Sequence, residues 1–222
     1  MVEQDRHPAQ KFNRAGTFVA IERSLNALAG LSRTFTGESN TDVSSRKTPL
    51  FLAGEELAKV VRANVYDAVT ALLEYGPNDV RGQIDAETLL CNTAVRVNNG
   101  LLAPDRSIFR AWNTEIAVHS PMEQVELEFS KFAEDFATRW CGGFQAPVDF
   151  AAWVEYRSNA RGHFFTDGCG RISRAISIAS LGRAGLTYPQ FKNRGEYFDL
   201  IAGSLESWTV QYRSRIPLIL RS

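Results

Sequence analysis

One stretch decides the fold, and it reads His163-Phe164-Phe165-Thr166-Asp167-Gly168-Cys169-Gly170-Arg171-Ile172-Ser173-Arg174. It places a titratable base, a carboxylate, two glycines and two arginines within twelve residues. Glycine allows backbone angles that are closed to other residues, so neighbouring N–H groups can converge on one point. This composition suits neither a hydrophobic core nor an ordinary surface, and it indicates a binding site.

An apolar pattern follows the glycines and predicts a helix over residues 171–181, with Gly182 as its stop. The glycines therefore lie just before a helix N-terminus, where free N–H groups and the helix dipole favour an anion. Arg171 and Arg174 are three residues apart on the first turn, and their planar guanidinium groups suit phosphate oxygens. The residues predict a phosphate-binding loop with His163 as a base at its edge.

Two side chains of the stretch can carry chemistry. The pKa of an ordinary histidine lies near neutrality, so His163 can accept a proton from an alcohol as that alcohol attacks. Asp167 would repel a phosphate unless it held a cation, and Mg²⁺ is typically bound by one or two carboxylates together with phosphate oxygens. We therefore expect His163 to be the catalytic base and Asp167 to be a magnesium ligand.

The stretch resembles the signature of the Fic (fido) family, His-x-Phe-x-Asp/Glu-Gly-Asn-Gly-Arg-x-x-Arg. Every fixed position matches except one, because Cys169 stands where the family has Asn. A motif with this many fixed positions rarely arises by chance, whereas a lone glycine-rich loop is a weak signal. The resemblance extends loosely over residues 50–205. It implies a helical bundle with a short β-hairpin flap, preceded by a helical region at 1–49 and followed by a tail at 206–222.

The resemblance also implies a reaction. Fic proteins of this type are nucleotidyltransferases (protein adenylyltransferases) that move AMP from ATP to a Ser, Thr or Tyr hydroxyl of a target protein and release pyrophosphate. By this resemblance, His163 is the general base and Asp167 holds the Mg²⁺ that bridges the α- and β-phosphates. The α- and β-phosphates lie on backbone N–H groups, the β- and γ-phosphates on arginines, and the phosphate-binding residues are Gly168, Cys169, Gly170, Arg171 and Arg174.

A second implied feature is an inhibitory helix with the pattern Ser/Thr-x-x-x-Glu-Gly/Asn. Thr34 and Glu38 have this spacing, although Ser39 replaces the Gly or Asn. In the family this Glu pairs with the last arginine of the signature, here Arg174, and obstructs the γ-phosphate of the nucleotide. The alternative is that Thr34 caps a helix and Glu38 is a solvated charge. Both interpretations stay open.

A third implied feature is a flap over residues 109–119, which alternate weakly in polarity as a short exposed hairpin does. In the family the equivalent segment holds the target peptide by strand pairing, with the main chain supplying most of the interaction. His119 at its end is expected to be a solvated surface histidine. The residues expected to bind the target are Ala111, Trp112, Asn113, Thr114, Glu115 and Ile116.

Cys169 leaves several functions open. An Asn side chain has two good N–H donors and a thiol is a weak one, so a phosphate held by that side chain would lose about 1–3 kcal/mol. The protein could then be a weakened enzyme, or a nucleotide-binding regulator without turnover. It could also be a Fic-like enzyme that uses another nucleotide or diphosphate donor. A thiolate of lowered pKa is a further alternative, because Cys169 precedes a helix and lies near arginines.

Composition limits the class of protein. The 222 residues include 25 basic and 25 acidic side chains, a balance that calls for neither nucleic acid nor an anionic membrane. Three cysteines far apart in sequence argue against a disulfide framework or a zinc site, and Cys91 and Cys141 are expected to be structural. With no apolar run of about 20 residues and a polar start, we expect a cytoplasmic protein without a membrane span. Secretion as an effector without a signal peptide, and a homo-oligomer, stay open.

Periodicity predicts a mainly α fold without strand–helix alternation. A regular aromatic stripe over residues 122–140 is expected to face the core. The tail at 208–220 is ambiguous between strand and helix. Helices are expected at 16–31, 53–75, 84–98, 122–140, 150–160, 171–181 and 188–205.

Overall fold

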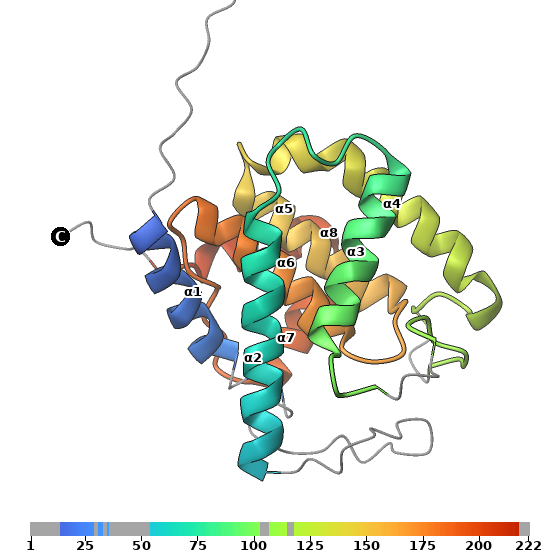
Figure 1. The fold of residues 1–222 in the computed structure, drawn as a ribbon, viewed down its shortest axis with the longest axis horizontal. Coiled ribbons are helices and arrows are strands. Elements are labelled where there is room, and N and C mark those ends of the chain that lie inside the picture. Colours follow the sequence, from blue (N-terminus) through green and yellow to red (C-terminus); the bar gives the residue numbers. More distant parts are fainter. Residues whose placement is uncertain are drawn as a thin grey trace, which may run out of the picture.

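A computed structural model describes residues 14–28, 31–32, 35, 54–102, 107–114 and 118–217. These residues are mainly helical, as the sequence predicts (Figure 1). Thr34 and Glu38, the proposed inhibitory pair, lie outside them, as do Glu115 and Ile116 of the expected flap. The α-helices in chain order are α1 (Arg14–Leu28), α2 (Gly54–Leu73), α3 (Gln83–Val97), α4 (Val125–Gly143), α5 (Pro147–Val154), α6 (Cys169–Arg183), α7 (Arg194–Ile201) and α8 (Leu205–Ser214).

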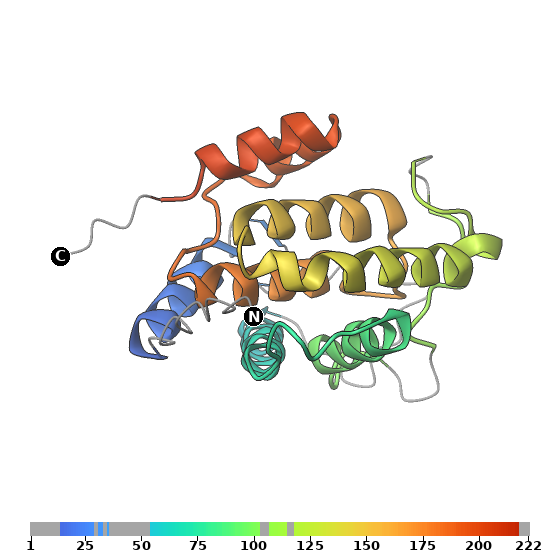
Figure 2. The ribbon, with the colours of Figure 1, turned by 90° about the horizontal axis from the view of Figure 1, so that it is seen from above.

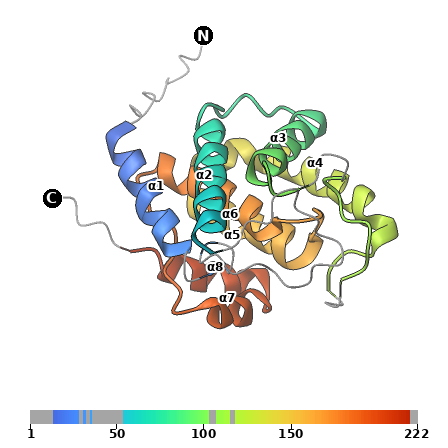
Figure 3. The same cartoon turned by 60° about the horizontal axis from the view of Figure 1, so that its bottom comes forward.

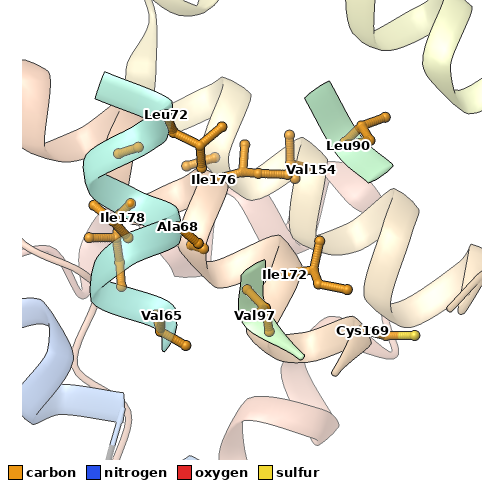
Figure 4. Packing of buried hydrophobic residues seen from close by; sticks show 14 of the residues in the cluster. Val65, Ala68, Leu72, Leu90, Val97, Val154, Cys169, Ile172, Ile176 and Ile178 are labelled. Atoms are coloured by element: carbon orange, nitrogen blue, oxygen red, sulfur yellow. The ribbon is translucent and has the colours of Figure 1, made fainter. Parts of the chain in front are cut away.

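Helix α6, which begins in the glycine-rich stretch, lies at the centre of the molecule. It contacts α1, α2, α3 and α5, and nearly all of its residues are buried. Figure 4 shows Ile172, Ile176 and Ile178 of α6 packed among apolar residues of α2 and α3. The hydroxyl of Ser177 donates to the carbonyl of Ala151 on α5 at 3.2 Å, so this buried polar group is satisfied. A helix covered on all sides positions its first turn rigidly, and that turn carries the candidate site.

The other helices lie on opposite sides of α5 and α6. Figure 2 shows α8 on one side of α5, with α2 and α3 on the opposite side of the molecule. The indole of Trp208 on α8 donates to the carbonyl of Ala152 at 2.9 Å. Helix α1 packs against the end of α6, where the Thr17 hydroxyl donates to the carbonyl of Gly182 at 3.2 Å. The Ser24 hydroxyl on α1 accepts from the N–H of Tyr188 at 2.8 Å.

The aromatic stripe faces the core as predicted, with one exception. Phe129, Phe132, Phe136 and Trp140 of α4 are buried against aromatic rings of α5 and the glycine-rich stretch. Met122 is 42% exposed instead, because it lies in a short 3₁₀ turn, η3 (Met122–Gln124), that precedes α4. The stripe therefore begins at Val125.

Two helix predictions differ from the structure, and the segment left ambiguous is resolved. The helix expected at 150–160 begins at Pro147, and from Glu155 it widens into a π-helix, η4 (Glu155–Gly162). The helix expected from residue 188 begins only at Arg194, because Asn193 caps it by accepting the N–H of Glu196 at 3.0 Å. The ambiguous tail is helical from Leu205 to Ser214.

The predicted β-hairpin is not seen. In the described parts of this segment, 107–114 and 118–121, the only ladder contact is an isolated antiparallel bridge from Phe109 to Phe165. The N–H of Arg110 donates to Phe164 at 3.0 Å, and Thr166 donates to Ile108 at 2.7 Å. The segment pairs with the glycine-rich stretch rather than with itself, because the Phe109 ring is held between core rings of α4 and that stretch. Figure 3 shows the segment beside the loop that precedes α6.

Among the described residues, no helix is both long enough and apolar enough to cross a bilayer.

Candidate functional site

A pocket opens at the N-terminal end of α6. All seven predicted catalytic, phosphate-binding and metal-binding residues line it: His163, Asp167, Gly168, Cys169, Gly170, Arg171 and Arg174. Their proximity follows from one turn of helix and the loop before it. Their chemical roles stay predictions.

The loop before α6 depends on Gly168. This residue has a φ of +75° and lies at the N-cap of α6, in the left-handed region that glycine tolerates best. A methyl group at this position would lie 2.9 Å from Oδ1 of Asn98 and 3.1 Å from Nη2 of Arg171. At Gly170 it would lie 3.0 Å from Nη1 of Arg174. Both glycines therefore let polar side chains approach the backbone of the loop.

His163 is held by the turn that ends η4. It has a φ of 48° and a ψ of 50°, and its N–H donates to the carbonyl of Ser158 at 2.8 Å. Its Nδ1 lies 3.4 Å from the carbonyl oxygen of Asn159. A carbonyl can only accept, so this contact favours a proton on Nδ1 and leaves Nε2 as the acceptor that a general base needs.

Arg110 connects His163 to the segment expected to form the flap. Only 3% of Arg110 is exposed, and its guanidinium donates to the carbonyls of His163 and Trp112, both at 2.6 Å, and to that of Ser120. Burial lowers the pKa of Arg110, and the nearby Cys169 acts in the opposite direction. Sequence reasoning did not assign this residue a role, because its partners are main-chain groups far along the chain.

Asp167 already has two partners. Its Oδ2 lies 3.0 Å from Nη2 of Arg171, and its Oδ1 accepts the N–H of Gly168 at 2.6 Å. Asn98, at the end of α3, donates to the Asp167 carbonyl at 3.0 Å and accepts from Arg171 at 3.1 Å. Asn98 was not predicted, and nothing in the local sequence pattern marks it. These bonds fix the loop and Arg171 together.

The fit of Mg²⁺ can be judged from these donors. The Asp167 side chain is 18% exposed and lines the pocket, yet in the described part of the chain no three His, Cys, Asp or Glu residues gather at one point. One carboxylate is enough for Mg²⁺ only where phosphate oxygens and water complete an octahedral shell. The residues therefore fit a metal ion that binds together with a phosphate ligand. The Asp167 carboxylate would then contact both the metal ion and Arg171.

Arg174 is buried in the wall of the pocket. It is 4% exposed, its guanidinium lies 4.8 Å from the centre of the Tyr197 ring, and its Nε has no hydrogen-bond partner within the described residues. Burial by itself lowers the pKa of Arg174. The phenols of Tyr197 and Tyr188 and the carboxylate of Glu155 outweigh it, so the pKa lies above its ordinary value. Arg174 is therefore a permanent cation in a buried position.

Glu155 anchors the tyrosines around Arg174. It is fully buried and accepts hydrogen bonds from the hydroxyls of Tyr188, Tyr197 and Tyr212 at 2.7, 2.8 and 2.9 Å. Burial and the Glu155 charge raise the pKa of all three phenols, which keeps them protonated as donors. This cluster could not be predicted from the sequence, because its members come from η4, a loop, α7 and α8.

The Cys169 side chain serves the loop. Its Sγ is buried and donates to the carbonyl of Phe165 at 3.3 Å. This contact requires the protonated thiol, because a carbonyl oxygen cannot donate. The geometry therefore disfavours both a nucleophilic thiolate and a phosphate held by this side chain.

His119 is not the solvated surface residue that was expected. Its ring stacks on the ring of His163, with centroids 4.4 Å apart and planes inclined by 9°. Burial, followed by the charges of His163, Arg110 and Arg161, lowers the pKa of His119 to about 4. The expectation was wrong because the N–H of Ser120 donates to the carbonyl of Arg161 at 3.1 Å and draws the segment onto η4.

Further pocket residues come from segments that the motif does not include. Arg194 and Phe198 lie four residues apart on α7 and so share a face, with the Arg194 guanidinium 5.1 Å from the Phe198 ring centre. Leu31 and Ser32, just after α1, and Asn159 of η4 also line the pocket. In the sequence, the only indication that α7 lines the pocket is an arginine and an aromatic residue at helical spacing, and such pairs are common.

No protein-family model matches this sequence, and no curated protein is similar enough to count as a relative. Membership of the Fic family therefore stays a prediction from residues 163–174.

Proposed function

We propose that this protein is a nucleotidyltransferase that transfers AMP from ATP to a hydroxyl group of a target protein. The observation that carries the proposal is the convergence of a base, a carboxylate, an open helix N-terminus and two buried arginines on one pocket. Helix N-termini and arginine forks both bind phosphate, and the buried Nε–H of Arg174 has no hydrogen-bond partner among the described residues. A polyphosphate next to a histidine suits group transfer better than simple storage of a ligand.

In the proposed reaction, the target hydroxyl oxygen attacks the α-phosphorus of ATP. The new P–O bond forms as the bond to the β-phosphate oxygen breaks, and pyrophosphate leaves with that electron pair. Nε2 of His163 takes the hydroxyl proton, while the N–H of its Nδ1 is directed to the carbonyl of Asn159. The N–H groups of the loop and the guanidinium of Arg171 stabilise the charge that develops on the phosphates. Asp167 would hold Mg²⁺, which would neutralise phosphate charge when bound.

A second candidate is a regulator that binds nucleotide without transferring it. The ion pair between Asp167 and Arg171 favours this candidate, since it occupies the carboxylate that a magnesium ion would need. Cys169 adds no argument for it, because its thiol bonds within the loop. ATP binding without transfer would distinguish the two functions.

The deciding experiment is label transfer from α-³²P-ATP with magnesium, with self-labelling as the readout while the target is unknown. We expect label on the protein, loss of label in His163→Ala, and no label when γ-³²P-ATP replaces the α-labelled form. Arg174→Ala should also lose label, whereas Arg213→Ala, which alters an exposed arginine of α8, should keep it. Label only from the γ-position would indicate phosphate transfer. ATP binding with no label from either position would favour the regulator.

The proposed inhibitory pair can be tested in the same assay. Leu31 and Ser32 bring the chain after α1 to the pocket wall, which is where an inhibitory segment would have to act. Glu38→Gly should increase labelling, because the glutamate would no longer pair with Arg174. Unchanged labelling in Glu38→Gly would favour the alternative, in which Thr34 is a cap and Glu38 a solvated charge.

A further inference from the structure

His119 and His163 form a stacked pair of imidazoles at the edge of the pocket. Their planes are inclined by only 9°, with centroids 4.4 Å apart. Nδ1 of His119 lies 2.8 Å from the Thr114 hydroxyl oxygen, so the second ring is also held in place. The motif that predicts the site contains only one member of this pair, and the reaction proposed above does not use the other.

The two rings are anchored by one guanidinium. Arg110 donates to the carbonyl of His163 at 2.6 Å and also to the carbonyl of Ser120, the neighbour of His119. The N–H of Ser120 donates in turn to Arg161 of η4 at 3.1 Å. The backbones that carry the rings therefore cannot move apart without breaking buried bonds of Arg110.

Burial and the charges around it keep the ring of His119 neutral at physiological pH. Burial lowers its pKa most, the charges of His163, Arg110 and Arg161 act in the same direction, and the pKa lies at about 4. A neutral ring can cover a base that gains a proton without adding a second positive charge. It also keeps water from that face of His163.

We propose that His119 is a positioning residue for His163, whose ring it holds in the orientation that presents Nε2 to the attacking hydroxyl. Nδ1 of His163 contacts the carbonyl oxygen of Asn159 at 3.4 Å, near the upper limit for a hydrogen bond. The stack on His119 restrains rotation of the His163 ring about its bond to the backbone. The inference rests on the proposed function for its catalytic consequence, but the stack itself can be measured without any activity.

The test compares wild type with His119→Phe and His119→Ala. Phenylalanine keeps a ring that can stack but cannot titrate, and alanine removes the ring. The sequence has three histidines, so the ¹⁵N and ¹H signals of the imidazoles can be assigned by single substitutions. We expect the Nδ1–H tautomer and the ring-current shift of His163 in wild type and in His119→Phe, and the loss of both in His119→Ala. Identical His163 signals in all three proteins would overturn the proposal.

Transfer kinetics give the second readout. His119→Ala should reduce kcat on the order of 10²-fold, the cost typical of a misplaced catalytic group, with the KM for ATP nearly unchanged. His119→Phe should restore most of kcat. A His119→Phe protein that folds but is as slow as His119→Ala would overturn the stacking role. If wild type transfers no label, the proposed function fails, and the NMR comparison alone decides the positioning role.

Thr114→Val is the milder variant, in case His119→Ala does not fold. It removes the hydroxyl at 2.8 Å from His119 while both imidazole rings remain. We expect a smaller loss of the His163 ring-current shift, in the same direction. An unchanged shift in Thr114→Val, together with unchanged transfer, would show that the hydrogen bond does not hold the stack.

Discussion

At the scale of single residues, Arg174 connects the core with the pocket. Most of its surroundings are aromatic and acidic, and its Nε–H has no hydrogen-bond partner in the part of the chain that the structure describes. Buried donors without partners are rare, and in this position the missing partner is best supplied by an anion in the pocket. The residue therefore predicts a ligand more directly than any feature of the surface does.

Arg174→Lys should separate triphosphate binding from binding of the nucleoside. An ammonium group keeps the charge but lacks the planar fork, so it cannot replace the bonds of the guanidinium to two phosphate oxygens. We expect the Kd for ATP to rise by about tenfold or more, as lost charge-assisted bonds of ~1–3 kcal/mol imply. The Kd for AMP should change little. Calorimetric titration measures both, and an equal loss for AMP would contradict the assignment of Arg174 to the outer phosphates.

His119 predicts a dependence of stability on pH. Its pKa is about 4 in the folded protein and near 6.5 in the unfolded chain, because burial and neighbouring cations oppose its protonation. As pH falls from 6.5 towards 4, the unfolded chain binds a proton that the folded protein does not, so the free energy of unfolding decreases. The side chain is only half-buried, and solvent screening therefore keeps the effect below the limit of about 1.4 kcal/mol per pH unit.

His119→Phe removes this titration and keeps the ring. The free energy of unfolding of His119→Phe, relative to that of wild type, should therefore be higher at pH 5 than at pH 7.5. Urea unfolding of both proteins at both pH values measures this difference. A difference between the two proteins that does not change with pH would show that the low pKa does not contribute to stability.

At the scale of elements, the loop before α6 depends on a glycine that faces polar side chains. Gly168 and Gly185 both have positive φ, of 75° and 70°. A methyl group at Gly168 would lie 2.9 Å from Asn98, whereas none of the described atoms lies within 4 Å of one at Gly185. A side chain would therefore strain the backbone in the same way at both positions, which differ in their neighbours.

Gly185→Ala is thus the matched control for Gly168→Ala. Each should lose about 1–2 kcal/mol of folding free energy from the left-handed backbone. Only Gly168→Ala should also displace Asn98 and Arg171 and abolish nucleotide binding. Chemical unfolding and ATP titration give the two quantities, and unimpaired ATP binding by Gly168→Ala would exclude the loop as the phosphate site.

The elements also show what local sequence can predict. The core helix α6 was expected from the glycines and the isoleucines that follow, and its first turn begins within two residues of the prediction. The π-helix η4 was missed, because a widened turn leaves no periodic signal of its own. The expected hairpin is not seen in the described residues, where Phe109 forms a bridge with Phe165 in a distant part of the chain.

At the scale of the whole molecule, Glu155 joins η4 to the last two helices. Its three tyrosine donors come from the loop after α6, from α7 and from α8. Such clusters could not be predicted from sequence, because a lone glutamate among polar residues usually faces water. The same reason explains why Asn98 and His119 were not recognised, since their partners are fixed only by the folded chain.

Glu155→Gln should destabilise the protein by about 3–5 kcal/mol, the loss typical of removing one partner of a buried charge cluster. Tyr212→Phe removes only one hydrogen bond to this carboxylate and should cost about 1.5–3 kcal/mol. Urea unfolding of the two variants measures the difference. A Glu155→Gln loss no greater than that of Tyr212→Phe would show that the charge of Glu155 is not required.

The docking of α1 onto the end of α6 has a consequence for biosynthesis. Thr17 is bonded to a residue 165 positions later, and the pocket wall includes Phe198. At about 5–20 residues per second, the ribosome needs roughly 10–30 s to extend the chain from Thr17 to Gly182. During this time the apolar face of helix α1 has no α6 to pack against and is accessible to chaperones. The pocket likewise lacks part of its lining until Phe198 has been synthesised.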